Sequence, residues 1–136
     1  MDTRSKIISL DEAASLAARL RAEGRRLAVA AGGFDVLQAA HARRLASLAS
    51  GGAAVLAAVY DDASLCTVTQ QRRPVLSEHA RARLVAGLAA VDYVLIWPFP
   101  DLDELVRRLA PDRLERLWPG ERHIIGEVLA RHKPNR

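Results

Sequence analysis

Cysteine and aromatic side chains are scarce in this chain of 136 residues. The single cysteine, Cys66, excludes an intramolecular disulfide and a zinc site built from several cysteines. His79, His123 and His132 have no companion spacing that indicates metal ligation, so no protein-bound metal is expected. No apolar run approaches the roughly 20 residues that span a bilayer. The N-terminus also lacks the apolar core of a signal peptide, so we expect a cytoplasmic protein with no membrane partner.

Small aliphatic and basic residues dominate instead. Hydrophobic residues make up 50% of the chain and aromatics only 4%, which predicts a core of alanine, leucine and valine packed between helices and a sheet. The net charge is +4, and arginine supplies nearly all of the positive charge. A basic surface attracts phosphorylated ligands, although high arginine and alanine content also follows from a GC-rich genome. Nucleic acid is a less favoured partner because no basic run is interleaved with stacking aromatics.

Strand and helix signals alternate along the chain. Continuous apolar runs at 27–31 and 53–60 are typical of parallel strands covered on both faces, and a third strand is expected at 92–97. Helices are expected from a capping box at Ser9 to a stop at Gly24, at about 41–49, after Ser77, from about 100 to Pro111, and at about 121–131. The helix after Ser77 is expected to place Ala80, Leu84, Val85 and Leu88 on one apolar face.

This order predicts an α/β fold, a Rossmann-like doubly wound parallel sheet flanked by helices. We expect one domain over 1–136, with an N-terminal helical lead-in at 1–26 and an atypical tail at 113–136. Ligands of such sheets bind at the carboxyl ends of the strands. Gly32-Gly33, Asp61-Asp62 and Trp97-Pro98 each follow a predicted strand, so the candidate site lies where these pairs converge.

The glycine pair opens a longer motif, Gly32-x-Phe34-Asp35-x-Leu37, which ends at His41. This segment resembles the Gly-x-Phe-Asp-x-Leu-His-x-Gly-His (HxGH) signature of the nucleotidyltransferase superfamily. That superfamily includes glycerol-3-phosphate cytidylyltransferase and the adenylyltransferase domain of ADP-heptose synthases. The resemblance covers roughly residues 6 to 112, since Asp62-Ala-Ser64, Arg73-Pro-Val75, Arg81 and Val91-Asp92 follow in the family's order.

The chain also departs from the family pattern. Gln38 stands where the family has its first motif histidine, and Ala40 where it has the motif glycine. Gln70-Gln71-Arg72 replaces a segment that commonly carries lysine. After Asp112 the family continues into a Lys-Gly-Gly strand and a Ser/Thr-rich helix start, and neither is recognisable in this chain. The resemblance therefore implies the fold and a weakened activity.

The resemblance assigns roles by position. His41 and Gln38 take the catalytic positions, and Asp62, Ser64 and Asp92 take the acceptor pocket. The nucleotide- or phosphate-binding positions are Gly32, Gly33, Phe34, Asp35, Arg72 and Arg81. Magnesium would arrive with a nucleoside triphosphate if the protein is active, and no other cofactor is implied.

Structural roles compete with several of these assignments. Asp35 would bond backbone amides to shape the turn, Phe34 would belong to the core, and His41 would cap a helix at the surface. Asp62 and Ser64 would cap the next segment, Asp92 would orient the entry of a strand, and Arg72 and Arg81 would be solvated.

Three functions remain open at this stage. The first is a domain that binds a nucleotide or phosphorylated metabolite with weakened or lost transfer. The second is an active nucleotidyltransferase that joins a nucleotide to a sugar or polyol phosphate. The third is a non-catalytic scaffold or oligomer module, for example a homodimer. Fold alone does not choose between them.

Overall fold

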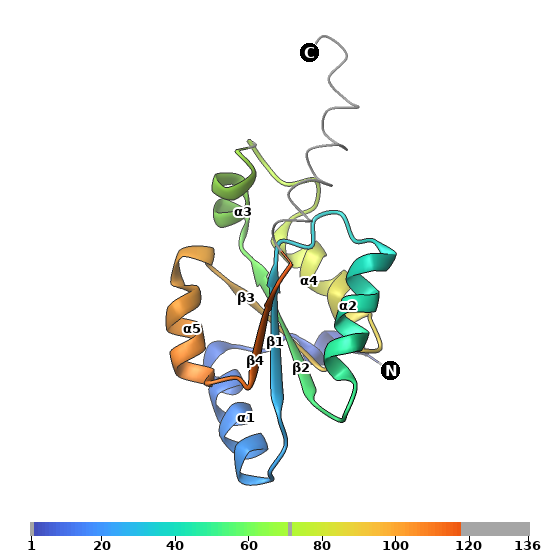
Figure 1. The fold of residues 1–136 in the computed structure, drawn as a ribbon. Coiled ribbons are helices and arrows are strands. Elements are labelled where there is room, and N and C mark those ends of the chain that lie inside the picture. Colours follow the sequence, from blue (N-terminus) through green and yellow to red (C-terminus); the bar gives the residue numbers. More distant parts are fainter. Residues whose placement is uncertain (1, 71, 118–136) are drawn as a thin grey trace.

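Four parallel strands form one sheet in the order β3-β2-β1-β4 (Figure 1). The structure is a computed structural model, and it describes residues 2–70 and 72–117. The strands are β1 (Leu27–Gly32), β2 (Ala54–Tyr60), β3 (Tyr93–Trp97) and β4 (Arg113–Arg116). Because β1 has β2 on one side and β4 on the other, the strand order reverses direction at β1. That reversal is the switch point at which open α/β sheets bind ligands.

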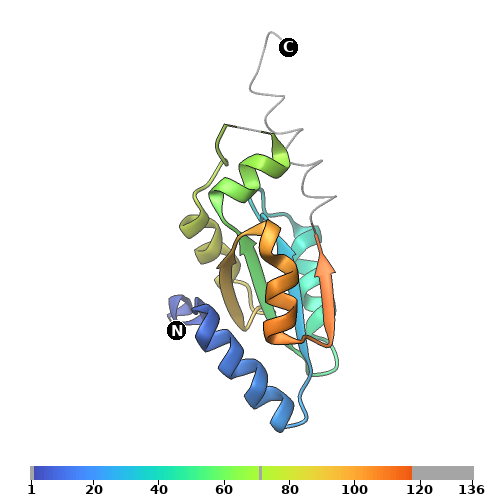
Figure 2. The same ribbon diagram turned by 90° about the vertical axis from the view of Figure 1, so that its left-hand side faces the viewer.

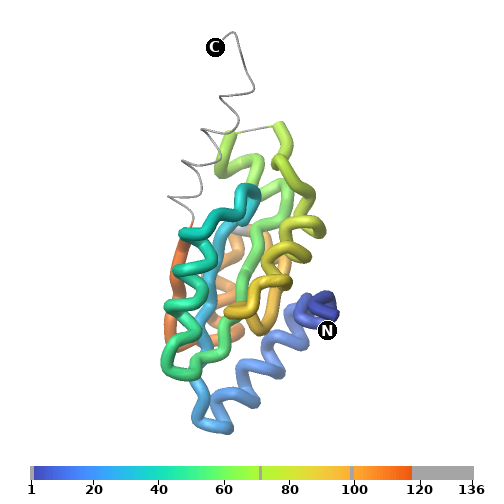
Figure 3. The backbone as a smooth tube through the Cα atoms, turned by 90° about the vertical axis from the view of Figure 1, so that its right-hand side faces the viewer, coloured from blue at the N-terminus to red at the C-terminus, as the bar shows by residue number. Residues whose placement is uncertain are grey.

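Helices cover both faces of the sheet. On one face lie α1 (Leu10–Ala22) and α5 (Leu102–Leu109), as Figure 2 shows from that side. The other face carries α2 (Ala39–Ala49) and α4 (Glu78–Ala86), seen in front in Figure 3. The helix α3 (Asp62–Thr69) stands beyond the carboxyl ends of the strands (Figure 1). Two 3-10 turns, η1 (Thr3–Lys6) and η2 (Phe99–Asp101), precede α1 and α5.

The sheet interior is built almost entirely from small aliphatic residues. All six residues of β1 and all seven of β2 are buried. Alternate residues serve the two faces: Val29 and Leu56 pack under α1 and α5, whereas Ala30 and Val55 pack under α2 and α4. Burial on both faces explains why these strands read as unbroken apolar runs rather than as alternating patterns.

The predicted Rossmann-like α/β fold is confirmed as a single domain. The three predicted strands are present, and each predicted helix within the described residues is present. Ser9 and Glu12 form the expected capping box, since each side chain accepts a hydrogen bond from the other residue's backbone N–H. Gly24 has a φ of +73°, the left-handed conformation that suits the end of a helix.

Three expectations were wrong or incomplete. Leu84 is 49% exposed rather than part of the apolar face of α4, which consists of Ala82, Val85 and Ala86. The helix α3 was not predicted, because its eight residues carry almost no apolar periodicity. The strand β4 was not predicted either, although it pairs with β1 and shows that the tail from Arg113 begins inside the sheet. The predicted helix at 121–131 lies outside the described residues.

No helix within the described ranges has the length and apolar character needed to cross a membrane.

The central strand β2 gives a direct test of this core. Leu56 is fully buried there, so Leu56→Ala should lower the free energy of unfolding by about 2–5 kcal/mol through lost contacts and a residual cavity. The matched control is Leu84→Ala, which removes the same atoms from the exposed face of α4 and should change stability by less than about 0.5 kcal/mol. Urea unfolding measures both, and equal losses would contradict the assigned core.

Candidate functional site

The glycine turn connects the end of β1 to the start of α2 at the carboxyl edge of the sheet (Figure 1). Gly32 is the last residue of β1 and pairs with Val59 of β2. The adjacent Phe34 has a φ of +55° and is fully buried. A bulky residue in this left-handed conformation costs about 1–3 kcal/mol, and such strain clusters at functional sites. The prediction that Phe34 belongs to the core is confirmed.

Asp35 ties the glycine turn to a loop 40 residues further along the chain. Its carboxylate accepts hydrogen bonds from the backbone N–H of Val75 at 2.6 Å and of Leu76 at 2.7 Å. Only 3% of Asp35 is exposed. A carboxylate bonded to two amides is strongly held at such burial. Asp35 therefore bonds backbone amides as expected, and these amides belong to the loop before α4.

Arg81 of α4 also binds the glycine turn and the loop before α4. Its side chain is fully buried, and its Nη1 donates to the carbonyl oxygens of Gly33 and Tyr60, both at 2.7 Å. The Nε atom donates to the carbonyl of Leu76 at 3.0 Å. The Nη2 atom donates to Asp62 Oδ1 at 2.7 Å, forming an ion pair with that carboxylate. One guanidinium thus binds the ends of β1 and β2, the loop before α4 and the start of α3.

This geometry changes the role expected for Arg81. The solvated arginine considered from the sequence is contradicted by its burial, and at zero exposure the side chain presents no surface to a ligand. We therefore assign Arg81 to positioning the turn rather than to contacting a phosphate. Asp62, 41% exposed at its side chain, bonds Arg81, and its backbone N–H donates to Glu78 Oε1 at 2.8 Å.

Asp61 caps α3, because its side chain accepts a hydrogen bond from the backbone N–H of Ser64. Ser64 is buried. Glu78 was not predicted as part of this region, and Asp61 was expected there as a residue that follows a strand but not as a helix cap. The signal for Asp61 was present, because an aspartate three residues before Ser64 has the spacing of a helix cap.

His41 lies in the first turn of α2 and is only 5% exposed, so it is not the surface histidine considered from the sequence. Its Nδ1 accepts a hydrogen bond from the backbone N–H of Gln38 at 3.0 Å, so it does cap the helix. Burial lowers the pKa of His41 below its usual 6.5. An accepting Nδ1 requires the neutral form with the proton on Nε2. His41 can therefore offer one neutral N–H donor to a ligand.

The exposed residues that immediately precede His41 are uncharged. Gln38, Ala39 and Ala40 are exposed at the start of α2, and no acidic residue occupies its first turn. Arg72 is exposed on the loop held by Asp35, and its carbonyl accepts from the thiol of Cys66 at 3.5 Å. Burial raises the pKa of that thiol, which agrees with an unreactive side chain.

Asp92 does not lie with the other candidates. It precedes β3, and its Oδ2 accepts from the backbone N–H of Val55 at 2.9 Å near the start of β2. This is the amino edge of the sheet, opposite the glycine turn. The acceptor-pocket role for Asp92 is therefore not supported, whereas its predicted role in orienting the strand entry agrees with the structure.

These elements define a nucleotidyltransferase-like α/β domain with its glycine turn at the switch point of the sheet. No family model matches the chain. The chain is 32% identical over 131 residues to the bifunctional protein HldE of Wolinella succinogenes, covering 96% of this chain and 28% of that protein. It is 32% identical over 113 residues to HldE of Desulfatibacillum aliphaticivorans, covering 83% of this chain and 23% of that protein.

A solved structure agrees in fold. A lipopolysaccharide core biosynthesis protein from Thermoplasma volcanium has a TM-score of 0.59 and 24% identity, with 65% of this chain and 71% of that chain covered. The chain is thus a homologue of one part of the HldE proteins, about a quarter of their length, and fits the HxGH nucleotidyltransferase superfamily. The resemblance inferred from the glycine motif is confirmed.

Arg81 provides the first test of the site. Arg81→Leu should lower the free energy of unfolding by about 3 kcal/mol or more, because buried carbonyls and the Asp62 carboxylate lose their donor. The matched control is Arg83→Leu on the exposed side of the same helix, with an expected change below about 0.5 kcal/mol. Chemical denaturation compares the two, and similar values would show that Arg81 does not hold the strand ends.

His41 predicts a pH dependence of stability. Its pKa is lower in the folded chain than in the unfolded chain, so the folded state binds fewer protons and loses stability as pH falls below about 6.5. Denaturation between pH 5 and 8 should show this loss in the parent chain and a smaller one in His41→Gln. His79→Gln, at an exposed position, should retain the parent slope. An unchanged slope in His41→Gln would contradict a neutral buried histidine.

Proposed function

We propose that the chain binds a nucleotide or other phosphorylated metabolite at the glycine turn, with nucleotidyl transfer weakened or lost. The observation that carries the proposal is the hydrogen bond from the Gln38 N–H to His41 Nδ1, which leaves Nε2 as the donor in the first turn of α2. The free N–H groups and positive dipole of a helix N-terminus favour an anion. Arg72 on the adjoining loop would supply positive charge, since Asp35 fixes that loop against the turn.

The chemistry of transfer explains why activity would be weak. The acceptor's phosphate oxygen attacks the α-phosphorus of a nucleoside triphosphate, and the bond to the leaving pyrophosphate breaks. The protein mainly positions two anions and stabilises the charge that develops between them. Gln38 offers only a neutral amide where the family has a histidine. One lost donor of this kind costs about 2–4 kcal/mol of transition-state stabilisation, or roughly 10²–10³ in rate.

Magnesium would enter as part of the bound triphosphate. The described residues contain no group of three or more His, Cys, Asp or Glu side chains suited to hold a metal ion. Magnesium in phosphoryl-transfer sites is commonly held by substrate phosphates with one or two carboxylates. The acceptor would lie on the α3 side of the turn, near Asp62 and Ser64.

Calorimetric titration with CTP and with ATP, each with Mg²⁺, tests the proposal. We expect saturable binding of one nucleotide, and Arg72→Ala should weaken it about tenfold by removing a charge-assisted contact. The control is Arg25→Ala, an exposed arginine near the amino edge, which should leave the affinity unchanged. No heat with either nucleotide would favour the scaffold alternative. Pyrophosphate release with a sugar or polyol phosphate at ordinary enzymatic rates would establish the active alternative.

Restoring the motif gives a gain-of-function test. Gln38→His combined with Ala40→Gly should raise nucleotide affinity and any pyrophosphate release, because a second donor returns beside His41. Gly at position 40 costs about 1 kcal/mol of helix stability, which a thermal melt would register separately. Ala18→Gly, at an exposed position in α1, is a control for the glycine alone. Unchanged affinity and rate would count against a surviving pocket.

A further inference from the structure

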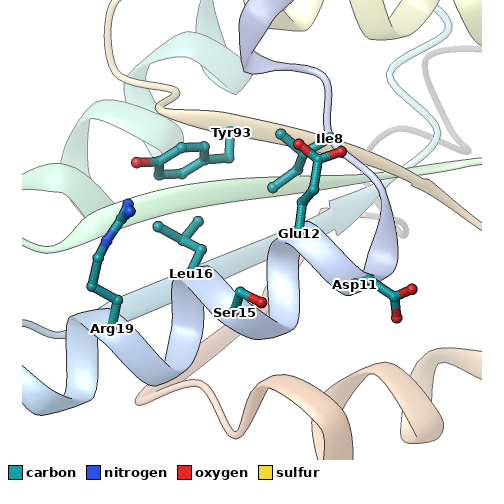
Figure 4. Close-up of a pocket in the computed structure, with 7 residues that line it drawn as sticks. All are labelled: Ile8, Asp11, Glu12, Ser15, Leu16, Arg19 and Tyr93. Atoms are coloured by element: carbon teal, nitrogen blue, oxygen red, sulfur yellow. The ribbon is translucent and has the colours of Figure 1, made fainter.

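A groove of about 420 Å³ lies between α1 and the start of β3 (Figure 4). Its floor is apolar and consists of Ile8, Leu16 and Tyr93. Leu16 belongs to the main core, and Ile8 and Tyr93 pack against it while remaining partly exposed. The groove lies at the β3 edge of the sheet, two strands away from β1, whose end carries the glycine turn. The proposed nucleotide site makes no use of it.

The two ends of this groove carry opposite charges. Glu12 and Asp11 stand at one end and Arg19 at the other (Figure 4). Glu12 and Arg19 are seven residues apart, so they share a face of α1 and are separated by about 10 Å along its axis. Within residues 2–70 and 72–117, Arg19 makes no ion pair, whereas Asp11 pairs with Arg108 of α5 at 3.6 Å. Glu12 accepts one bond, from Ser9.

We propose that this groove is the contact surface between two copies of the chain, related by a two-fold axis near Ser15. Ser15 and Leu16 lie midway between Glu12 and Arg19, so antiparallel docking of two α1 helices places each Arg19 opposite the partner copy's acidic end. Ser15 is small and exposed, which permits close approach at the axis. A two-fold contact requires a surface that complements itself in this way.

A second copy fits this surface better than a small ligand does. Binding pockets enclose most of a small ligand, whereas Asp11, Glu12, Ser15 and Arg19 are all exposed along one side of this groove. A typical stable interface takes about 800 Å² from each partner. That area is about a tenth of the 7728 Å² surface of the chain. The 13-residue helix α1 is only about 20 Å long, so we expect a dimer of micromolar affinity.

Sedimentation velocity over about 1–200 μM, with the full chain and no nucleotide, tests the interface. Arg19→Glu places like charges at both symmetric contacts and should raise the dimer dissociation constant tenfold or more. Arg83→Glu makes the same charge change on the exposed side of α4 and should leave dissociation unchanged. Circular dichroism establishes that each variant is folded. A parent chain that stays monomeric to 200 μM, or equal effects of both variants, would overturn the proposal.

A charge exchange tests the two-fold arrangement itself. Asp11→Lys combined with Glu12→Gln should also weaken self-association, and glutamine at position 12 preserves the capping box. Mixing this variant with Arg19→Glu should restore association, because both contacts of the mixed dimer then join opposite charges. Restoration supports antiparallel α1 docking. Failure to restore, with both variants folded, would reject it. Since no nucleotide is present, either result is independent of the proposed binding function.

Discussion

The carboxyl edge of this sheet depends on one buried guanidinium. Arg81 donates to the last carbonyls before two strand-to-helix turns, to the loop before α4 and to the carboxylate of Asp62. Parallel strands end with carbonyl groups that no neighbouring strand binds, and burying such groups without donors is costly. A fixed planar cation with five N–H groups can satisfy several of them at once, which lysine cannot do. The shape of the glycine turn therefore follows from a residue on a distant helix.

Asp35 complements Arg81, because its carboxylate binds backbone N–H groups of the loop whose carbonyl Arg81 binds. Arg81 draws carbonyls of the turn and of the loop toward α4, while Asp35 accepts the amides of Val75 and Leu76 in the same loop. Oppositely charged side chains thus hold the two loops together through backbone groups. Phe34 lies between these two loops and has a left-handed backbone conformation. The hydrogen bonds on either side hold it there, because together they outweigh the strain of one residue. His41 follows this turn, where burial lowers its pKa and its Nδ1 accepts the Gln38 N–H.

Sequence reasoning succeeded where burial is continuous and failed where structure depends on distant partners. The strands at 27–31 and 53–60 are unbroken apolar runs, so their pattern alone identified them. The strand β4 reads Arg-Leu-Glu-Arg and is recognisable only through its pairing with β1 and the ion pair between Arg44 and Glu115. Arg81 looked like a solvated helix residue for the same reason. Nothing local indicates that Gly33, Tyr60 and Leu76 converge on it.

Residues that depart from the family motif differ in solvent exposure from residues that match it. Asp35, Phe34 and Arg81 match the resemblance and are buried. Gln38 and Ala40 depart from it and are exposed at the mouth of the turn. Exposed positions can change with little effect on folding, whereas removal of a buried charge partner destabilises the chain. Buried groups thus fix the backbone of the turn, whereas the departures lie at exposed positions beside it. A chain with altered exposed groups can therefore keep the backbone of this turn, and Gln38 and Ala40 stand at exposed positions of this kind.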